Sequence, residues 1–128
     1  MHDHDRILRD AYAAFARGDL DGYLVHCTDD ITFTVPGHNK VSGVYSRAEF
    51  GPGLIAKVMN ATAGTFVETV LDVFTSARGG VVYAHHAFDA KGEKREYRTM
   101  HLYDIRDGKL ASFREVPVEM AKFQEAWS

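Results

Sequence analysis

The chain has 128 residues, of which 45% are hydrophobic and 26% are charged, and its net charge is -3. This length suits one folded domain with a substantial buried core, and the composition is that of a globular protein. The acidic balance and the lack of a basic stripe argue against a nucleic-acid partner. We therefore expect one domain over residues 1–128.

Signals for export, membrane insertion and disulfide formation are missing from the sequence. No apolar run approaches the ~20 residues that a membrane-spanning helix needs. The first five residues lack the basic and apolar regions of a signal peptide. Cys27 is the only cysteine, so no internal disulfide can form. These features predict a cytoplasmic protein that does not engage a membrane.

Two helices are predicted at the start of the chain. Residues 4–17 have the apolar spacing of an amphipathic helix. Gly18 stands where a left-handed cap ends such a helix. Asp19 can cap a second helix, which we expect to extend to about Cys27.

A strand and a third helix follow. Residues 31–35 alternate apolar and threonine side chains, which predicts a strand that ends at Pro36. Residues 46–49, with the sequence SRAE, form a capping box that begins a helix. Pro52 falls inside this helix and removes a backbone donor, so we expect a kink or a restart there.

The second half of the chain has the pattern of strands joined by tight turns. Turn sequences at residues 78–80, 91–93 and 106–108 separate four predicted strands, over residues 66–76, 81–90, 94–105 and 109–116. Consecutive hairpins with long arms predict a strongly bent antiparallel sheet, followed by a short helix over residues 119–127. Three helices packed on one face of such a sheet define the α+β class.

Two segments resemble the NTF2-like superfamily, and its SnoaL-like branch in particular. Residues 12–22 and 28–33, with the sequences YAAFARGDLDG and TDDITF, look like the opening of NTF2-like proteins, including ketosteroid isomerase. Residues 101–115, HLYDIRDGKLASFRE, resemble the last hairpin of SnoaL-like polyketide cyclases and limonene epoxide hydrolases. The resemblance implies a cone-shaped α+β barrel closed around one mostly apolar pocket.

The implied pocket lies between the concave face of the sheet and the helices. We expect side chains of both layers to line it: Phe15, Phe33, Val35, Phe50, Leu54, Val58, Tyr103 and Phe113. The resemblance implies no cofactor. The sequence has neither the His-x-His nor the His-Glu-x-x-His spacing of common metal sites, so we expect no metal.

Three polar residues are candidates for catalysis in that pocket. By resemblance, Tyr12 matches the tyrosine that ketosteroid isomerases use as an oxyanion donor. His101 matches a pocket histidine of SnoaL-like cyclases, and Glu115 matches the catalytic aspartate of cyclases and epoxide hydrolases. Pairing across the last hairpin brings His101 and Glu115 within a few residues of register. A carboxylate in an apolar pocket has a raised pKa and can act as a base near neutral pH.

Two residues limit this interpretation. The aspartate base of ketosteroid isomerases aligns with Val35, which cannot abstract a proton, so we do not expect steroid isomerisation by that mechanism. His85 and His86 are neighbours on one predicted strand and point to opposite faces, so one of them at most reaches the pocket. Each candidate also has a structural interpretation, since a core tyrosine or a buried His–Glu pair can simply specify the fold.

Three functional hypotheses remain open. The first is an enzyme that acts by cofactor-free proton transfer, as in cyclisation, isomerisation or epoxide opening, on an apolar substrate. Glu115 would be its base or acid, His101 the proton partner or oxyanion donor, and Tyr12 a hydrogen-bond donor. The alternative is a non-catalytic binding protein for a small hydrophobic ligand. The third is an interaction module, because the resemblance implies a homodimer through the outer face of the sheet, and β-branched and aromatic residues on both faces of the later strands favour a dimer.

Overall fold

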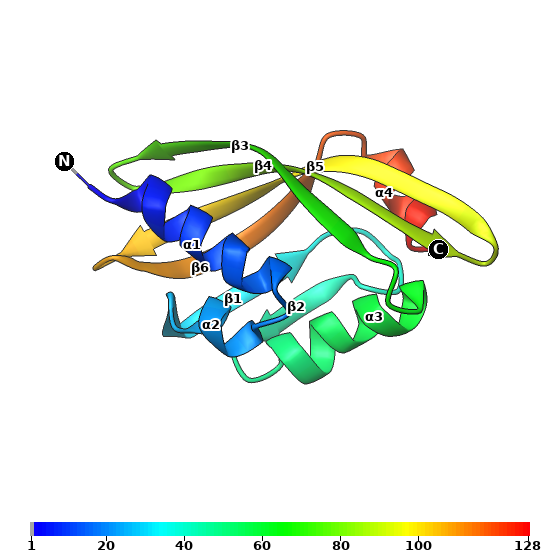
Figure 1. Cartoon of the computed structure of the whole chain (residues 1–128), viewed down its shortest axis with the longest axis horizontal. Helices are drawn as coiled ribbons and strands as arrows, with labels where there is room; N and C mark the ends of the chain where they lie inside the picture. Colours follow the sequence, from blue (N-terminus) through cyan, green and yellow to red (C-terminus); the bar gives the residue numbers. More distant parts are fainter. Residues whose placement is uncertain (1) are drawn as a thin grey trace.

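One curved sheet, covered by helices on its concave side, makes up the computed structural model, which describes residues 2–128 (Figure 1). Within that range the sheet has six strands in the order β2-β1-β6-β5-β4-β3. The strands are β1 (Cys27–Val35), β2 (Gly43–Ser46), β3 (Val67–Ser76), β4 (Gly79–Ala90), β5 (Glu93–Arg106) and β6 (Lys109–Pro117). The helices are α1 (His4–Ala16), α2 (Leu20–Leu24), the π-helix η1 (Phe50–Ile55), α3 (Ala56–Thr62) and α4 (Met120–Ala126). The predicted α+β class is confirmed.

The α1–α2 corner follows the predicted capping pattern. Gly18 adopts a left-handed φ of 77°, and the amide of Asp19 donates to the carbonyl of Ala14 at 2.9 Å. The Asp19 carboxylate then accepts from the Gly22 amide at 2.8 Å and caps α2. The second helix is shorter than predicted, because Cys27 already belongs to β1, where it pairs with Leu110 of β6.

The predicted restart at Pro52 is confirmed. The amide of Ser46 donates to the Glu49 carboxylate at 2.9 Å, and the amide of Glu49 donates to the Ser46 hydroxyl at 3.2 Å, so the capping box forms. The chain then winds as a π-helix over Phe50–Ile55, and regular α3 begins only at Ala56. Pro52 lies inside the π-helical segment, where its missing amide prevents the regular α-helical ladder.

The prediction of a wholly antiparallel sheet is wrong at one junction. β1 pairs antiparallel with β2 but parallel with β6, with Phe33 opposite Phe113. The strand β2 was not predicted either, because four residues between turns carry little local pattern. Pairing of β1 with β6 joins segments about eighty residues apart and is a tertiary contact that no local sequence pattern records.

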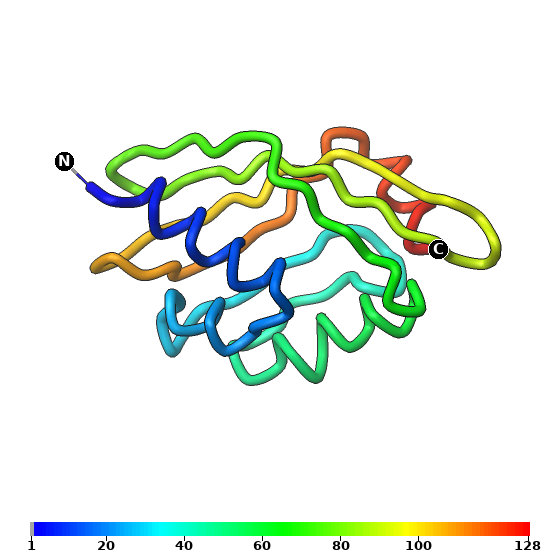
Figure 2. The backbone as a smooth tube through the Cα atoms, in the orientation of Figure 1, coloured from blue at the N-terminus to red at the C-terminus, as the bar shows by residue number. Residues whose placement is uncertain are grey.

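Tight turns and bulges give the sheet its bend. Two loops, at Lys91-Gly92 and Asp107-Gly108, have positive φ at both positions, which is the turn type that matches the twist of a hairpin. Register shifts mark one extra residue in β3, between Val70 and Asp72, and one in β6, between Leu110 and Ser112. Such bulges increase local twist and bend a strand. Figure 2 follows the bent sheet from the β1–β2 hairpin, beside α2 and α3, to the β3–β4 hairpin beside the start of α1.

Alternating side chains divide the sheet into an inner and an outer face. On β5, Tyr97, Thr99, His101 and Tyr103 are buried and face the helices. The intervening residues face outward. The core and the polar candidates therefore share the concave side of the sheet, between the strands and α1, α2 and α3 (Figure 1).

The outer face carries a row of apolar side chains. Phe74 pairs with Val81, and Val81 pairs with Leu102, so the three lie side by side across β3, β4 and β5. Phe74 is 56% exposed and Leu102 45% exposed. This row lies where we expect the homodimer contact. None of the helices within residues 2–128 has the length and apolar character to traverse a lipid bilayer.

Replacing Leu102 with Asp tests the expected dimer. We expect the native protein to sediment as a dimer and Leu102→Asp to sediment as a monomer, because burying a carboxylate from each subunit costs several kcal/mol per ion. The matched control is Val25→Asp, since Val25 is also an exposed apolar residue but follows α2 on the helical side. A native protein that is monomeric at all concentrations, measured by analytical ultracentrifugation, contradicts the prediction.

Candidate active site

A cavity of about 70 Å³ lies between the concave sheet face and the helices. Seven of the eight predicted lining residues border it: Phe15, Val35, Phe50, Leu54, Val58, Tyr103 and Phe113. A wider groove between α1, α3 and β3 shares Tyr12, Phe15, Ile55, Phe66 and Glu68 with the cavity and adjoins it.

Phe33 does not border the cavity, contrary to prediction. Its ring is fully buried and lies 4.5 Å from the Phe50 ring and 5.6 Å from the Phe113 ring, centroid to centroid. Phe33 thus packs behind two residues that do line the cavity. The alternation of side chains in β1 correctly placed Phe33 on the inner face. Whether its ring reaches the cavity or lies behind other rings depends on side-chain packing, which the alternation does not specify.

Tyr12 of α1 reaches into the polar end of the cavity. Its Oη lies 2.6 Å from Nδ1 of His101 and 2.7 Å from Oη of Tyr103. Tyr103 Oη lies 2.8 Å from Oη of Tyr23. The three phenols form a buried hydrogen-bonded chain, and chains of this kind polarise each other. The helical spacing that placed Tyr12 on the buried face of α1 therefore predicted its position correctly.

His101 and Glu115 are direct cross-strand partners on β5 and β6. Both side chains are buried, and His101 Nε2 lies 3.5 Å from Glu115 Oε2. That carboxylate oxygen has no hydrogen-bond partner in the described part of the chain. The sequence brought the pair within a few residues of register, and the structure places the two residues opposite one another.

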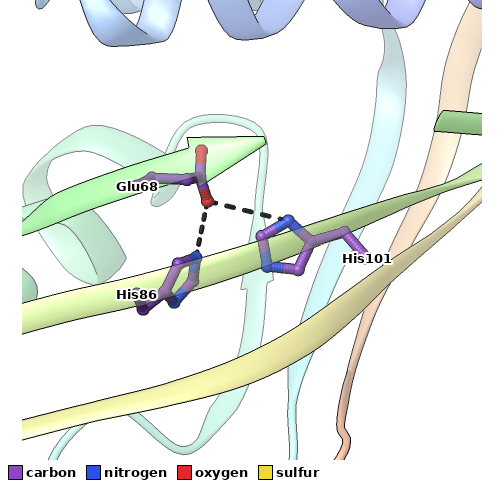
Figure 3. A group of neighbouring side chains, drawn as sticks. All are labelled: Glu68, His86 and His101. Atoms are coloured by element: carbon purple, nitrogen blue, oxygen red, sulfur yellow. Dashed lines mark hydrogen bonds and ion pairs between the residues drawn. The ribbon is translucent and has the colours of Figure 1, made fainter. Parts of the chain in front are cut away.

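Sequence reasoning missed Glu68 and did not choose between His85 and His86. His86 of β4 faces the cavity, and its Nε2 lies 2.6 Å from Glu68 Oε2 on β3 (Figure 3). Its other nitrogen, Nδ1, lies 2.9 Å from Oη of Tyr97. His85 points outward, where its Nε2 lies 3.6 Å from Glu96. Hairpin pairing could have indicated His86, since Tyr97, its partner across β5, falls in the same alternating series as His101.

At this end of the cavity, contacts between oppositely charged groups shift the pKa values of Glu68, His101 and Glu115 toward the charged forms. Burial lowers the pKa of His101, but contact with Glu115 and the charge of Glu68 outweigh burial, so the His101 pKa lies above its ordinary value. Burial raises the pKa of Glu115, but contact with His101 outweighs it and the net shift is downward. The expectation of a raised Glu115 pKa is therefore wrong. In the same way, contact with His86 outweighs burial and lowers the pKa of Glu68.

Three side chains in this group are arranged as metal ligands could be. Glu68, His86 and His101 each offer one donor atom, and these atoms all lie within 4.8 Å of one another (Figure 3). The three residues come from three different strands. Sequence motifs for metal sites rely on ligands that lie close together in the sequence, so they cannot reveal a group of this kind. The expectation of no metal site rested on such motifs alone.

Buried phenols and a buried thiol predict loss of stability in alkali. Burial raises the pKa of Tyr12, Tyr23, Tyr97 and Tyr103, and it raises the pKa of Cys27 to about 12. These groups hold their protons more tightly in the folded than in the unfolded chain. Their contribution to stability is complete below the unfolded values of about 8.5 to 10 and is lost as pH rises through the folded values.

We therefore expect a cooperative unfolding transition above pH ~10 in which these four tyrosines ionise together with loss of the near-ultraviolet circular dichroism. Tyrosinate absorbance and circular dichroism, recorded on the same samples, check this. Tyr83→Phe, at a position on the outer sheet face, should leave the cooperative step in place. Ionisation of all six tyrosines before any loss of structure contradicts the expectation.

Comparison with known proteins gives the family of the chain. Residues 8–113 match the model of the SnoaL-like domain. The uncharacterized protein Rv0034 of Mycobacterium tuberculosis (strain ATCC 25618 / H37Rv) is 26% identical over 124 residues, which are 95% of this chain and 94% of that protein.

Solved structures share the whole fold. Bal32a, from a soil-derived mobile gene cassette, has a TM-score of 0.88 at 20% identity and covers 98% of this chain and 96% of its own. TerC, co-crystallized with polyporic acid, has a TM-score of 0.83 at 19% identity and 96% coverage of both chains. An NTF2-like protein of unknown function from Burkholderia pseudomallei K96243 has a TM-score of 0.86 at 20% identity, with coverage of 100% and 99%. The fold is NTF2-like, and this chain belongs to the family of SnoaL-like domains.

Proposed function

We propose that this protein is an enzyme that transfers a proton on a small apolar substrate bearing a carbonyl or ring oxygen, as in cyclisation, isomerisation or epoxide opening. One observation carries the proposal: Tyr12, His101 and Glu115 meet at the polar end of an otherwise apolar cavity. His101 Nδ1 lies 2.6 Å from Tyr12 Oη, and His101 Nε2 lies 3.5 Å from Glu115 Oε2. An acid, a base and an oxyanion donor within one contact network are the groups that such chemistry requires.

Glu115 is the proton acceptor in this proposal. Its carboxylate is ionised and buried, and its Oε2 has no hydrogen-bond partner within residues 2–128. It would take the proton from a carbon next to a carbonyl. His101, whose pKa is raised by contact with Glu115 despite its burial, would stabilise the charge of the carboxylate before the transfer. The same proton can return to another carbon of the substrate, so the reaction needs no external oxidant or reductant.

Tyr12 supplies the hydrogen bond to the developing oxyanion. Its hydroxyl is supported by Tyr103, and Tyr103 by Tyr23. As negative charge grows on a substrate oxygen beside Tyr12, each phenol in the chain can shift its hydrogen bond toward that charge. Preorganised donors of this kind account for large parts of enzymatic rate enhancement.

Val35 narrows the class of reaction. It borders the cavity and is buried, but it carries no carboxylate, so the base position of ketosteroid isomerase is apolar here. We therefore assign proton abstraction to Glu115 on β6 rather than to the end of β1, where Val35 lies. The family and the fold neighbour TerC, co-crystallized with polyporic acid, support a small organic molecule as the occupant of the cavity.

Glu115→Gln tests the base. We expect a loss of ~10²–10⁴-fold in turnover, because the amide is similar in shape but cannot accept the proton. The measurement is solvent deuterium incorporation into a panel of enolisable ketones, followed by nuclear magnetic resonance, together with hydrolysis of a panel of epoxides. Arg114→Gln is the matched control, since Arg114 is the preceding residue of β6 and faces outward. Equal rates for the native protein and Glu115→Gln on any accepted substrate end the assignment.

Tyr12→Phe tests the oxyanion donor. Loss of one such hydrogen bond should reduce kcat by ~10²–10³-fold with a small change in KM, because the bond strengthens only as negative charge develops. Phe15→Leu, one helical turn further along α1 and also bordering the cavity, should change KM more than kcat. A variant Tyr12→Phe with native kcat contradicts the role.

The alternative, a binding protein without catalysis, predicts a different result. Native mass spectrometry of the purified protein would then show a bound hydrophobic molecule that stays chemically unchanged during incubation. If every ligand found in this way remains intact, and no ketone or epoxide of the panels reacts, the binding function is correct and the enzymatic proposal is wrong.

A further inference from the structure

Two histidines and one carboxylate converge from three adjacent strands at the polar end of the cavity. Glu68 Oε2 on β3 lies 2.6 Å from His86 Nε2 on β4 and 3.8 Å from His101 Nδ1 on β5. Figure 3 shows both rings directed at the same carboxylate oxygen. Ligand bonds to Zn²⁺ are about 2.0–2.2 Å long. Small side-chain rotations would therefore bring the three atoms, already within 4.8 Å of one another, around one ion.

The opposite edges of both rings face a second carboxylate. Glu115 Oε2 lies 3.5 Å from Nε2 of His101 and 3.8 Å from Nδ1 of His86. Histidines that ligate metals usually direct their other nitrogen to a carboxylate or a similar acceptor, which sets the tautomer and the ring orientation. Glu115 occupies this outer position for His101, whereas Nδ1 of His86 is at hydrogen-bonding distance from Tyr97. A hydrogen bond from His101 Nε2 would also satisfy the unpartnered oxygen of Glu115.

Tyr97 holds the other ring nitrogen of His86. The Tyr97 oxygen accepts a hydrogen bond from Nε1 of Trp127 at 2.8 Å and lies 2.9 Å from Nδ1 of His86. This phenol can accept a proton from Nδ1 as well as donate its own, so it fits His86 in the form that has its lone pair on Nε2. In the ion-bound form, the ion replaces the proton between each imidazole and Glu68, since metal binding releases the protons of its ligands.

The charge of the cavity favours a cation. Of the described residues that border it, none is Lys or Arg, whereas Glu68 and Glu115 both do. Among the residues that border the cavity, only His86 and His101 can therefore balance the negative charges of Glu68 and Glu115. A position open to the cavity would remain on the ion, since the protein provides three ligands and Glu68 also borders the adjoining groove.

We propose that Glu68, His86 and His101 bind one divalent transition-metal ion, such as Zn²⁺, with Glu115 orienting His101 and Tyr97 orienting His86 from outside. Two imidazoles and one carboxylate with open positions suit first-row transition metals rather than Mg²⁺. Tyr12 Oη, 2.6 Å from His101 Nδ1, moves away from that nitrogen when the ion binds. The inference goes beyond the proposed proton transfer and does not depend on it.

The experiment uses the full chain, treated with a chelator and carrying His2→Gln, because His2 and His4 stack at the N-terminus and can bind stray metal. Calorimetric titration with Zn²⁺ should give one site per chain, and Co²⁺ should give visible absorption bands of a protein-bound ion. Mg²⁺ at the same concentrations should give no heat of binding. Glu68→Gln and His86→Gln should each weaken Zn²⁺ binding by more than 100-fold, beyond the ~10–100-fold that outer positions such as Glu115→Gln cost.

His85→Gln is the matched control. His85 is the neighbour of His86 but lies on the outer face beside Glu96, so its replacement should leave Zn²⁺ affinity unchanged. Circular dichroism establishes that each variant is folded, and Glu68→Asp replaces Glu68→Gln if the latter does not fold. Equal Zn²⁺ binding by the native protein and His86→Gln, or less than one site per chain, overturns the proposal. The proposed proton transfer is tested separately, by deuterium incorporation with the metal-free Glu115→Gln variant, and that result does not depend on whether Zn²⁺ binds.

Discussion

Mutual compensation among buried ionisable side chains is the constraint on which this site depends. Glu68 and Glu115 flank His86 and His101, and each histidine has one nitrogen near each carboxylate. In a cavity lined mainly by aromatic and aliphatic residues, removing one member leaves its partner as an uncompensated buried charge, which is strongly destabilising. The four residues come from β3, β4, β5 and β6. The pairing of these strands must therefore be correct to one residue for the site to exist.

Tyr12 connects this charged group to the helical layer. Its hydroxyl joins α1 to the sheet through His101 and Tyr103. Tyr23 extends these hydrogen bonds from Tyr103 to α2. Burying phenol oxygens without partners would cost free energy, so the chain of bonds also positions the helices relative to the sheet. The atoms to which we assign the oxyanion role thus also meet a structural requirement, and the same hydrogen bonds keep these polar groups aligned.

The two proposals use opposite edges of one imidazole. Proton transfer depends on Nε2 of His101, which faces Glu115, whereas metal binding depends on Nδ1, which faces Glu68 and Tyr12. A carboxylate behind a histidine increases the basicity of its other nitrogen, whether that nitrogen meets a proton or a metal ion.

The sequence alone determined the helices, the long hairpins and the buried face on which Tyr12 lies, because these follow from periodicity, caps and turns within short segments. The family fold and the pocket positions of His101 and Glu115 were implied by the resemblance of two segments to SnoaL-like proteins. Tertiary structure decided the parallel pairing of β1 with β6, which joins distant segments, and the position of Phe33 behind other rings. It also decided the place of Glu68. Counting from the β3–β4 turn pairs Glu68 with Ala87 on the outer face, but the extra residue at Leu71 shifts the register by one and pairs it with His86. A strand has a side-chain period of two, so one bulged residue turns the side chains beyond it to the other face, and no local pattern in β3 reveals it.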